Sequence, residues 1–359
     1  MSRWGSTLAE LISPSRVRHQ SVPPLEAGLR PNSKLDDATI LREELEVDDL
    51  ALLGNGDVMM SHGTSLSRLD DPSSHFELGG QVSALVTGSD GDVVAAVEGR
   101  GLVRVTSDGT VSDLCIDSAV DGCVTAMALA DDGSILATRG SASRSSDDWS
   151  GALVHREATG SLVVVDGATA RVVADGLLWP SGVADAGDGE AIVSLSHEPT
   201  LVRIRVADGR RTTFFANLPA HPGRLTPHGD GWLVAFPYLR NRLSELLLEE
   251  RDFVSEMVST IDQDEWMVPQ LRNDNPYTSA LQLGQLRVLG VLKPWAPARS
   301  YGLLAAVDRD GRFAASLHSM VDGAQHGVTR VISRNDNLII AVRGSRTVIT
   351  TKENELHDR

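Results

Sequence analysis

The sequence predicts an all-β fold, a six-bladed β-propeller with a helical cap inserted in the fifth blade, on two observations. First, apolar stretches of strand length alternate with turns of Asp, Gly or Asn, which tolerate the positive φ of hairpin turns. Second, the turn glycines Gly91, Gly133, Gly189 and Gly231 lie 42, 56 and 42 residues apart. Periods near 40–50 residues, with about four short strands each, are typical of propeller blades. A β-sandwich with long insertions is the alternative fold.

Six turn-and-strand units can be counted along the chain. Their central turns and the strands that follow fall at residues 50–60, 90–96, 132–136, 188–193, 230–234 and 335–340. A strand expected near residues 38–45 is placed to complete the last blade. We therefore expect an N-terminal arm over residues 1–34, the propeller over 35–350 and a C-terminal tail over 351–359.

The segment 241–300 lengthens the fifth unit and has a different period. Its apolar residues recur at helical spacing, at Leu243, Leu246, Leu247, Phe253 and Met257. Asn241 or Ser244 is the expected helix N-cap. We expect a helical cap over one mouth of the propeller, either as a substrate lid or as an insertion that packs on the blade tops.

The chain carries 49 acidic and 33 basic residues, a formal net charge of −16. A field of that sign repels phosphate backbones and anionic lipids, so no nucleic-acid or membrane partner is expected. No window reaches the roughly 18 apolar residues of a membrane span, and residues 1–14 lack the apolar core of a signal peptide. We therefore expect a cytoplasmic protein whose partner is a small-molecule substrate.

The two cysteines, Cys115 and Cys123, fit no zinc-binding spacing and are too few for a disulfide framework. Free thiols are expected in a reducing cytosol, and a bridge between neighbouring loop ends is the alternative. The sequence also lacks a Gly-x-Ser-x-Gly elbow, a phosphate-binding loop and a dinucleotide fingerprint. Serine-hydrolase and nucleotide chemistry are therefore not expected.

An ordered series of segments resembles the strictosidine synthase-like branch of the gluconolactonase superfamily. The series covers roughly residues 45–350 and is densest over 122–241. Its segments include Ala130-Asp131-Asp132-Gly133, His155-Arg156-Glu157-Ala158-Thr159-Gly160, Trp179-Pro180-Ser181-Gly182, Phe215-Ala216-Asn217-Leu218-Pro219, Tyr301-Gly302-Leu303 and His326-Gly327-Val328-Thr329. The resemblance implies a six-bladed propeller with a polar central channel, reached where the innermost strand of each blade begins.

The superfamily includes calcium- or zinc-dependent lactonases and esterases, in which a Glu, two Asn and an Asp of the channel hold the metal. The resemblance places those four positions on Asp48, Thr125, Ser181 and Gly223. One carboxylate and two hydroxyls are a poor ligand set for a hard cation, which prefers several carboxylate and carbonyl oxygens. We therefore expect no cofactor, with Ca²⁺ or another divalent ion near Asp48 as the alternative.

The superfamily also includes plant enzymes that condense an amine with an aldehyde in a Pictet–Spengler ring closure. Their catalytic Glu at the start of blade six falls on Thr329, which is no general base near neutral pH without a partner. Histidine moves protons best near neutrality, and His221 and His326 lie nearest the inferred channel mouth, with surface or structural roles as the alternative. The candidate catalytic residues are therefore Asp48, His221, His326 and Thr329.

The candidate substrate-binding residues lie at the same channel mouth and are Thr125, Ser181, Arg224, Trp179 and Tyr238. Asp48, Thr125, Ser181 and Thr329 each begin the innermost strand of their own unit. Radial repetition should therefore bring these four residues to the axis on one face, with Gly223 and Arg224 entering from the fifth blade.

Three functions follow from these expectations. The first is a metal-independent enzyme of specialised metabolism that condenses an amine with a carbonyl compound or closes a ring, with Asp48 or a channel histidine taking the proton. The second is a lactone or ester hydrolase with a weakened divalent site at Asp48. The third is a non-catalytic propeller that binds a ligand or docks a partner through its cap.

Overall fold

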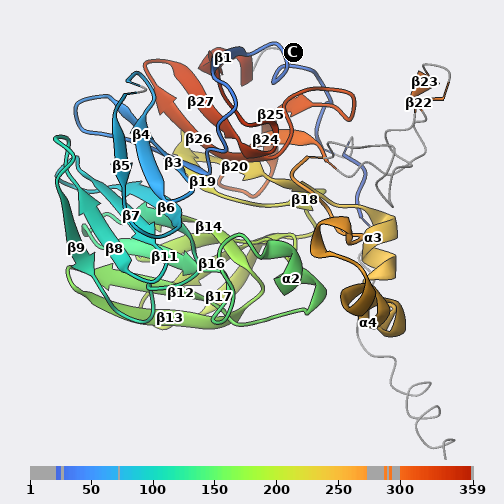
Figure 1. Ribbon diagram of the computed structural model, residues 1–359, viewed down its shortest axis with the longest axis horizontal. Coiled ribbons are helices and arrows are strands. Elements are labelled where there is room, and N and C mark those ends of the chain that lie inside the picture. Colours follow the sequence, from blue (N-terminus) through green and yellow to red (C-terminus); the bar gives the residue numbers. More distant parts are fainter. Residues whose placement is uncertain are drawn as a thin grey trace, which may run out of the picture.

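The computed structural model describes residues 22–25, 28–71, 73–272, 287–288, 291–292 and 300–356, which form a six-bladed β-propeller (Figure 1). This architecture confirms the predicted fold class. Each blade is a four-stranded antiparallel sheet, and the first strand of each blade contacts the first strand of its neighbours around the ring. No helix in these residues has the length and apolar character needed to cross a lipid bilayer.

The first five blades follow one another in chain order. Blade one contains β2 (Asp49–Leu52), β3 (Val58–His62), β4 (Ser65–Arg68) and β5 (His75–Glu77). Blade two contains β6 (Val82–Thr87), β7 (Val93–Val97), β8 (Gly101–Val105) and β9 (Val111–Cys115). Blade three contains β10 (Val124–Leu129), β11 (Ile135–Arg139), β12 (Gly160–Asp166) and β13 (Thr169–Leu177). Blade four contains β14 (Pro180–Gly187), β15 (Glu190–Leu195), β16 (Thr200–Arg205) and β17 (Arg211–Phe215). Blade five contains β19 (Leu225–His228), β20 (Gly231–Phe236), β24 (Gly302–Val307) and β25 (Phe313–Ser319).

The sixth blade closes the ring with strands from both ends of the chain. Its inner strands are β26 (Val328–Arg334), β27 (Asn337–Val342) and β28 (Thr347–Lys352). Its outermost strand is β1 (Thr39–Arg42), which pairs with β28 and aligns Thr39 with Thr350. The strand expected near residues 38–45 therefore completes the last blade as predicted, and β28 continues past the expected boundary at residue 350.

The hydrophobic core lies between neighbouring sheets. Met59 and Leu66 of blade one, for example, pack with Val93 and Val103 of blade two. These strands are apolar on both faces because each sheet is covered by a neighbour on either side. Cys115 and Cys123 are buried in this region as free thiols, as expected.

The fifth-blade insertion is helical, as predicted. It contains β21 (Tyr238–Leu239), α3 (Arg242–Leu247), α4 (Arg251–Thr260), the 3₁₀ turn η1 (Gln263–Glu265), β22 (Arg287–Val288) and β23 (Val291–Leu292). The Asn241 side chain accepts hydrogen bonds from the first turn of α3, which makes it the N-cap. β21 pairs with β18 (Ala220–His221), and residues 273–286, 289–290 and 293–299 of the insertion lie outside the described residues.

A further helix, α2 (Trp149–Val154), was not predicted. It lies in the loop between β11 and β12 of blade three, beside the cap (Figure 1). The Asp148 side chain caps it by accepting a hydrogen bond from the Gly151 amide at 3.1 Å. Two more 3₁₀ turns, η3 (Arg343–Ser345) and η4 (Glu353–Leu356), follow β27 and β28.

Candidate functional site

The four residues that the sequence places at the start of innermost strands meet at the propeller axis. Asp48, Thr125, Ser181 and Thr329 all line one cavity of about 70 Å³, as the sequence predicted. Gly223, Arg224, Trp179 and Tyr238 line the same cavity. The structure therefore brings together every candidate residue except the two histidines.

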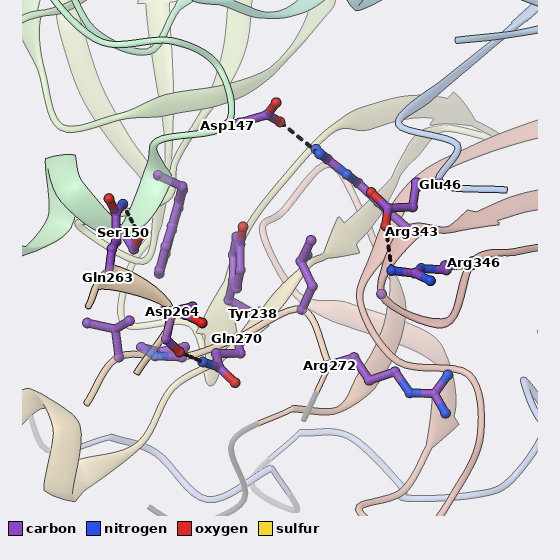
Figure 2. A pocket seen from close by; sticks show the side chains of 15 residues that line it. Glu46, Asp147, Ser150, Tyr238, Gln263, Asp264, Gln270, Arg272, Arg343 and Arg346 are labelled. Carbon is purple, nitrogen blue, oxygen red and sulfur yellow. Dashed lines mark hydrogen bonds and ion pairs between the residues drawn. The ribbon is translucent and has the colours of Figure 1, made fainter. Parts of the chain in front are cut away.

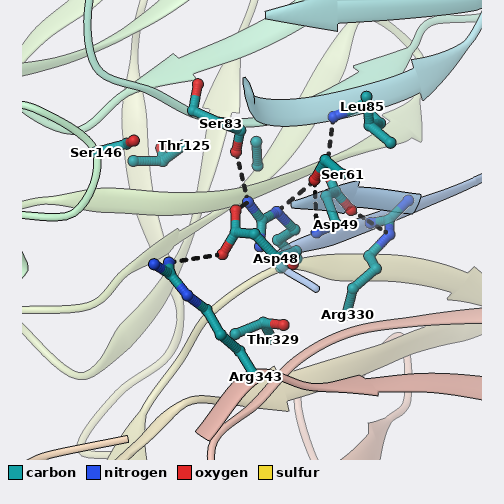
Figure 3. Close-up of polar contacts among 12 residues, drawn as sticks. Asp48, Asp49, Ser61, Ser83, Leu85, Thr125, Ser146, Thr329, Arg330 and Arg343 are labelled. Carbon is teal, nitrogen blue, oxygen red and sulfur yellow. Dashed lines mark hydrogen bonds and ion pairs between the residues drawn. The ribbon is translucent and has the colours of Figure 1, made fainter. Parts of the chain in front are cut away.

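Asp48 at the axis is held between two guanidinium groups (Figure 3). Arg224 Nη2 donates to Asp48 Oδ2 at 2.6 Å, and Arg343 Nη1 donates to Asp48 Oδ1 at 3.1 Å. Burial favours the neutral carboxyl, but the Arg224 and Arg343 charges outweigh that effect and lower the pKa of Asp48. A paired carboxylate of low pKa is a poor proton acceptor, so the structure does not support Asp48 as a general base.

Asp49, the next residue, is fully enclosed by the same network. Its carboxylate accepts hydrogen bonds from the amides of Leu50 and Leu85 at 2.8 and 2.7 Å. It also forms ion pairs with Arg224 Nε at 3.3 Å and with Arg330 Nε at 3.2 Å. Arg330 was not singled out in the sequence, although a charged residue within an apolar strand signals buried pairing.

A divalent ion near Asp48 does not fit this site. The Arg224 guanidinium already lies against the Asp48 carboxylate and also donates to the Ser83 carbonyl at 2.7 Å. Among the described residues, no group of three or more His, Cys, Asp or Glu side chains is placed to hold a metal. A cation bound there would face the fixed positive charge of Arg224, so we derive no reaction step through a metal.

Three hydroxyl groups at the axis each connect one blade to the next. Thr125 Oγ1 of blade three donates to the Pro180 carbonyl at 2.5 Å. Ser181 Oγ of blade four donates to the Pro222 carbonyl at 2.7 Å, ahead of blade five. Thr329 Oγ1 of blade six lies 3.5 Å from the Val47 carbonyl, ahead of blade one. These contacts give the three hydroxyls a role in ring closure and leave Thr329 without a base to activate it.

The two candidate histidines lie outside the cavity, which corrects the expectation that they face it. His221 is buried behind the Trp149 ring, 5.1 Å away edge-on, and its Nδ1 donates to the Ser196 carbonyl at 2.7 Å. Burial lowers the pKa of His221 to about 4. His326 is also buried, with Nε2 donating to the Met320 carbonyl at 2.8 Å and Nδ1 accepting from Ser300 at 2.9 Å. Both imidazoles are neutral hydrogen-bonded parts of the fold.

A larger cavity of about 500 Å³ lies at the mouth of the channel (Figure 2). Its aromatic wall is Trp149 stacked on Tyr238, with ring centroids 3.9 Å apart and planes inclined by 17°. The cap contributes the segment 268–272 to the opposite wall. Trp149, Tyr238, Leu271 and Arg343 line both cavities, so the mouth and the axis are adjacent compartments of one site.

Arg343 spans the two compartments. Its Nη1 reaches Asp48 at the axis, while its Nη2 donates at 2.8 Å to Asp147 in the blade-three loop (Figure 2). These contacts use two of the five N–H donors of the guanidinium. Sequence analysis missed Arg343, Asp147 and Trp149, because nothing in the strand pattern indicates that these loop residues reach the mouth.

Trp179 completes the wall of the axis cavity. It is buried, and its ring stacks on His197 with centroids 5.5 Å apart. Its backbone adopts a φ of 46°, which is uncommon for a bulky residue and persists only where the surroundings fix it. The rigid position of Trp179 makes it a fixed part of the cavity floor.

Comparison with known proteins identifies the fold. No protein-family model matches the sequence, and no curated protein matches it. Similar solved structures include a gluconolactonase from Xanthomonas campestris, at 11% identity and a TM-score of 0.55, covering 90% of this chain and 94% of that one. Regucalcin, a calcium-binding protein from Agrobacterium tumefaciens, has 12% identity and a TM-score of 0.55, covering 87% and 92%. At these identities the likeness shows the shared six-bladed propeller fold.

Proposed function

We propose that this protein is a metal-independent enzyme that binds a flat organic substrate in the mouth cavity. The observation that carries the proposal is the contrast between the arginine-filled axis and the open, aromatic mouth. A metal cation at the axis would need the Asp48 carboxylate as a ligand, but the Arg224 guanidinium already binds that carboxylate. The mouth offers about 500 Å³ beside a stacked Trp149–Tyr238 wall. Aromatic walls of this kind bind planar ligands by stacking and by burying apolar surface.

The reaction we propose is the condensation of an aromatic amine with a carbonyl compound, as the resemblance to the strictosidine synthase-like branch suggests. Burial raises the pKa of Tyr238, so its hydroxyl stays protonated and can donate a hydrogen bond at neutral pH. A donor aimed at a carbonyl oxygen stabilises the charge that develops as an amine attacks the carbon. Holding both reactants against one wall supplies a further acceleration by proximity. The amine nitrogen forms the new C–N bond, its proton passes through solvent water to the former carbonyl oxygen, and that oxygen leaves as water, so solvent takes the place of a carboxylate or histidine base.

A second candidate is a propeller that binds its ligand without turnover. It is favoured by the pairing of the titratable groups around the axis, since Asp48, His221 and His326 all have protein partners. The hydrolase with a divalent site at Asp48 has less support, because Arg224 competes for the ligand that such a site requires.

The test is a panel of aromatic amines and aldehydes, followed by mass spectrometry with and without a chelator. We expect product above the buffer rate, unchanged by the chelator. Tyr238→Phe keeps the ring and removes the donor, so kcat should fall at least about tenfold with KM nearly constant. Tyr238→Leu also removes the stacking surface and should raise KM about tenfold.

Each alternative gives a different result. Tight ligand binding without turnover of any pair would support the non-catalytic propeller and contradict the enzyme. Turnover abolished by the chelator and restored by Ca²⁺ would support the hydrolase-type metal site. If Tyr238→Phe and Tyr238→Leu had the same kcat and KM as the wild-type protein, the Trp149–Tyr238 wall would have no role in the reaction.

A further inference from the structure

We propose that Arg343 is the anchor for a carboxylate on the substrate, which takes the place of Asp147 when the ligand binds. The inference rests on the proposed function, because it assigns the substrate class of the same mouth cavity.

The charged cluster at the axis carries one positive charge in excess. It contains the guanidinium groups of Arg224, Arg330 and Arg343 and the carboxylates of Asp48 and Asp49, all within one network. A partly buried positive charge is costly unless an anion lies nearby. The site therefore requires one more negative group at its outer end.

Asp147 supplies that negative group from outside the cluster. It pairs with Arg343 at 2.8 Å, yet 47% of its side chain is exposed, compared with 14% for Asp48 on the inner side of the same guanidinium. It lies in the loop ahead of α2 and not in a blade strand. An exposed carboxylate on a loop is exchanged at low cost, because water solvates it when it leaves.

The place of exchange lies inside the ligand cavity. Asp147, Arg343, Trp149 and Tyr238 all line the 500 Å³ space, and Figure 2 shows the Asp147–Arg343 ion pair together with Tyr238. A planar ligand stacked on this wall would point its substituent toward Arg343. A carboxylate there can accept two parallel N–H bonds from the guanidinium, which fixes both position and orientation. The geometry thus favours a flat aromatic acid over a neutral analogue.

The experiment compares three acids with their amides, which have the same size and shape but no charge. The pairs are indole-3-acetate with indole-3-acetamide, phenylacetate with phenylacetamide, and benzoate with benzamide. Calorimetry on the full chain should show at least one acid that binds about tenfold tighter than its amide. The affinity of that acid should fall as salt is raised, whereas the affinity of the amide should not.

Two variants separate anchoring from general charge effects. Asp147→Asn removes the competing carboxylate on an exposed loop, so acid binding should tighten about threefold to tenfold with amide binding unchanged. Arg343→Lys keeps the charge but loses the planar fork, so the preference for the acid should shrink several-fold. Circular dichroism checks that both variants are folded.

The outcomes distinguish this inference from the proposed function. If acids and amides bind equally and Asp147→Asn changes neither, the anchor is wrong and the aromatic cavity stands. If amides bind tighter than acids, Arg343 is not available to ligands and the anchor is again wrong. If none of the six compounds binds, the mouth is no aromatic site, and both proposals fail.

Discussion

The axis and the mouth of this propeller both contain aspartate–arginine ion pairs, but these pairs differ in burial and in access to a ligand. At the axis, Asp48 and Asp49 are paired by arginines from blades five and six, beside a cavity of about 70 Å³. At the mouth, Asp147 and Arg343 face a space of about 500 Å³, and Arg343 uses only two of its five N–H donors in hydrogen bonds to the described residues. The axis is a closed structural network, whereas the mouth is open to a ligand.

The comparison shows that a shared position in a fold does not fix a shared role. Asp48 lies where the resemblance places a metal ligand, yet it binds a guanidinium. Arg224 of blade five contacts Asp48 of blade one and the Ser83 carbonyl of blade two, so it connects three blades at the centre of the ring. The connection at the centre of this ring is thus made by a side-chain cation, and the reaction that we propose uses the mouth cavity instead.

The largest expected effect comes from Arg224→Met, which keeps the length of the side chain and removes its charge. Asp48 and Asp49 then each lose a partner while they stay buried. Breaking a buried ion pair in this way costs about 3–5 kcal/mol of unfolding free energy. Urea unfolding followed by circular dichroism measures the loss.

The matched control for that variant is Arg312→Met, at an arginine that is 76% exposed and 3.7 Å from Asp310. We expect a change within about 0.5 kcal/mol there. A loss below about 1 kcal/mol for Arg224→Met would show that the axis network does not hold the ring together.

A second prediction concerns the pH dependence of stability and tests His221, which lies behind the Trp149 ring. In the folded protein, burial lowers the pKa of His221 to about 4, from an ordinary value of 6.5. Between these two pH values His221 binds a proton in the unfolded chain but not in the folded protein. Unfolding free energy should therefore fall on acidification from pH 6.5 toward 4, by up to about 1.4 kcal/mol per pH unit for this group.

Urea unfolding at pH 7, 6 and 5 measures that slope. His221→Gln should make the slope shallower, while His75→Gln, at a histidine whose side chain is 51% exposed, serves as the control. If His221→Gln leaves the slope unchanged, the buried imidazole is not linked to stability. The remaining slope in that variant would then belong to other buried histidines, such as His326, whose pKa is also lowered by burial.

Much of the fold could be predicted because it repeats. The Asp-Gly turns recur at blade spacing, and the strand near residues 38–45 has no partner except in the last blade, where β1 pairs with β28. The helical spacing after Asn241 likewise predicted α3 and α4. The α2 helix was missed because its six residues stand alone in a loop, whereas α3 is followed closely by α4 and their joint run of apolar residues shows the helical period.

The site could be predicted only in part. Position in the repeat placed Asp48, Thr125, Ser181 and Thr329 at the axis, because each precedes or begins an innermost strand. It could not assign their roles, which depend on what reaches them from other blades. Arg343, for example, is 295 residues from Asp48 in sequence, so no local pattern reveals their pairing. The histidines were misplaced because their positions near the starts of blades five and six suggested the channel mouth, whereas burial within the fold decided where their side chains point.

The smallest expected effect comes from Glu46→Gln. This variant tests how much of the difference between axis and mouth is due to the burial of the charged pairs. Glu46 at the mouth pairs with Arg346 of the sixth-blade turn at 3.0 Å, with side chains 51% and 61% exposed. Asp48, two residues later, pairs with Arg343 in the same turn. Both contacts therefore attach one short segment to the same turn, and they differ mainly in exposure. Surface pairs contribute about 0–1 kcal/mol, so we expect a loss of at most about 0.5 kcal/mol. If Glu46→Gln destabilised the protein as much as Arg224→Met in urea unfolding, the division into a closed axis and an open mouth would be wrong.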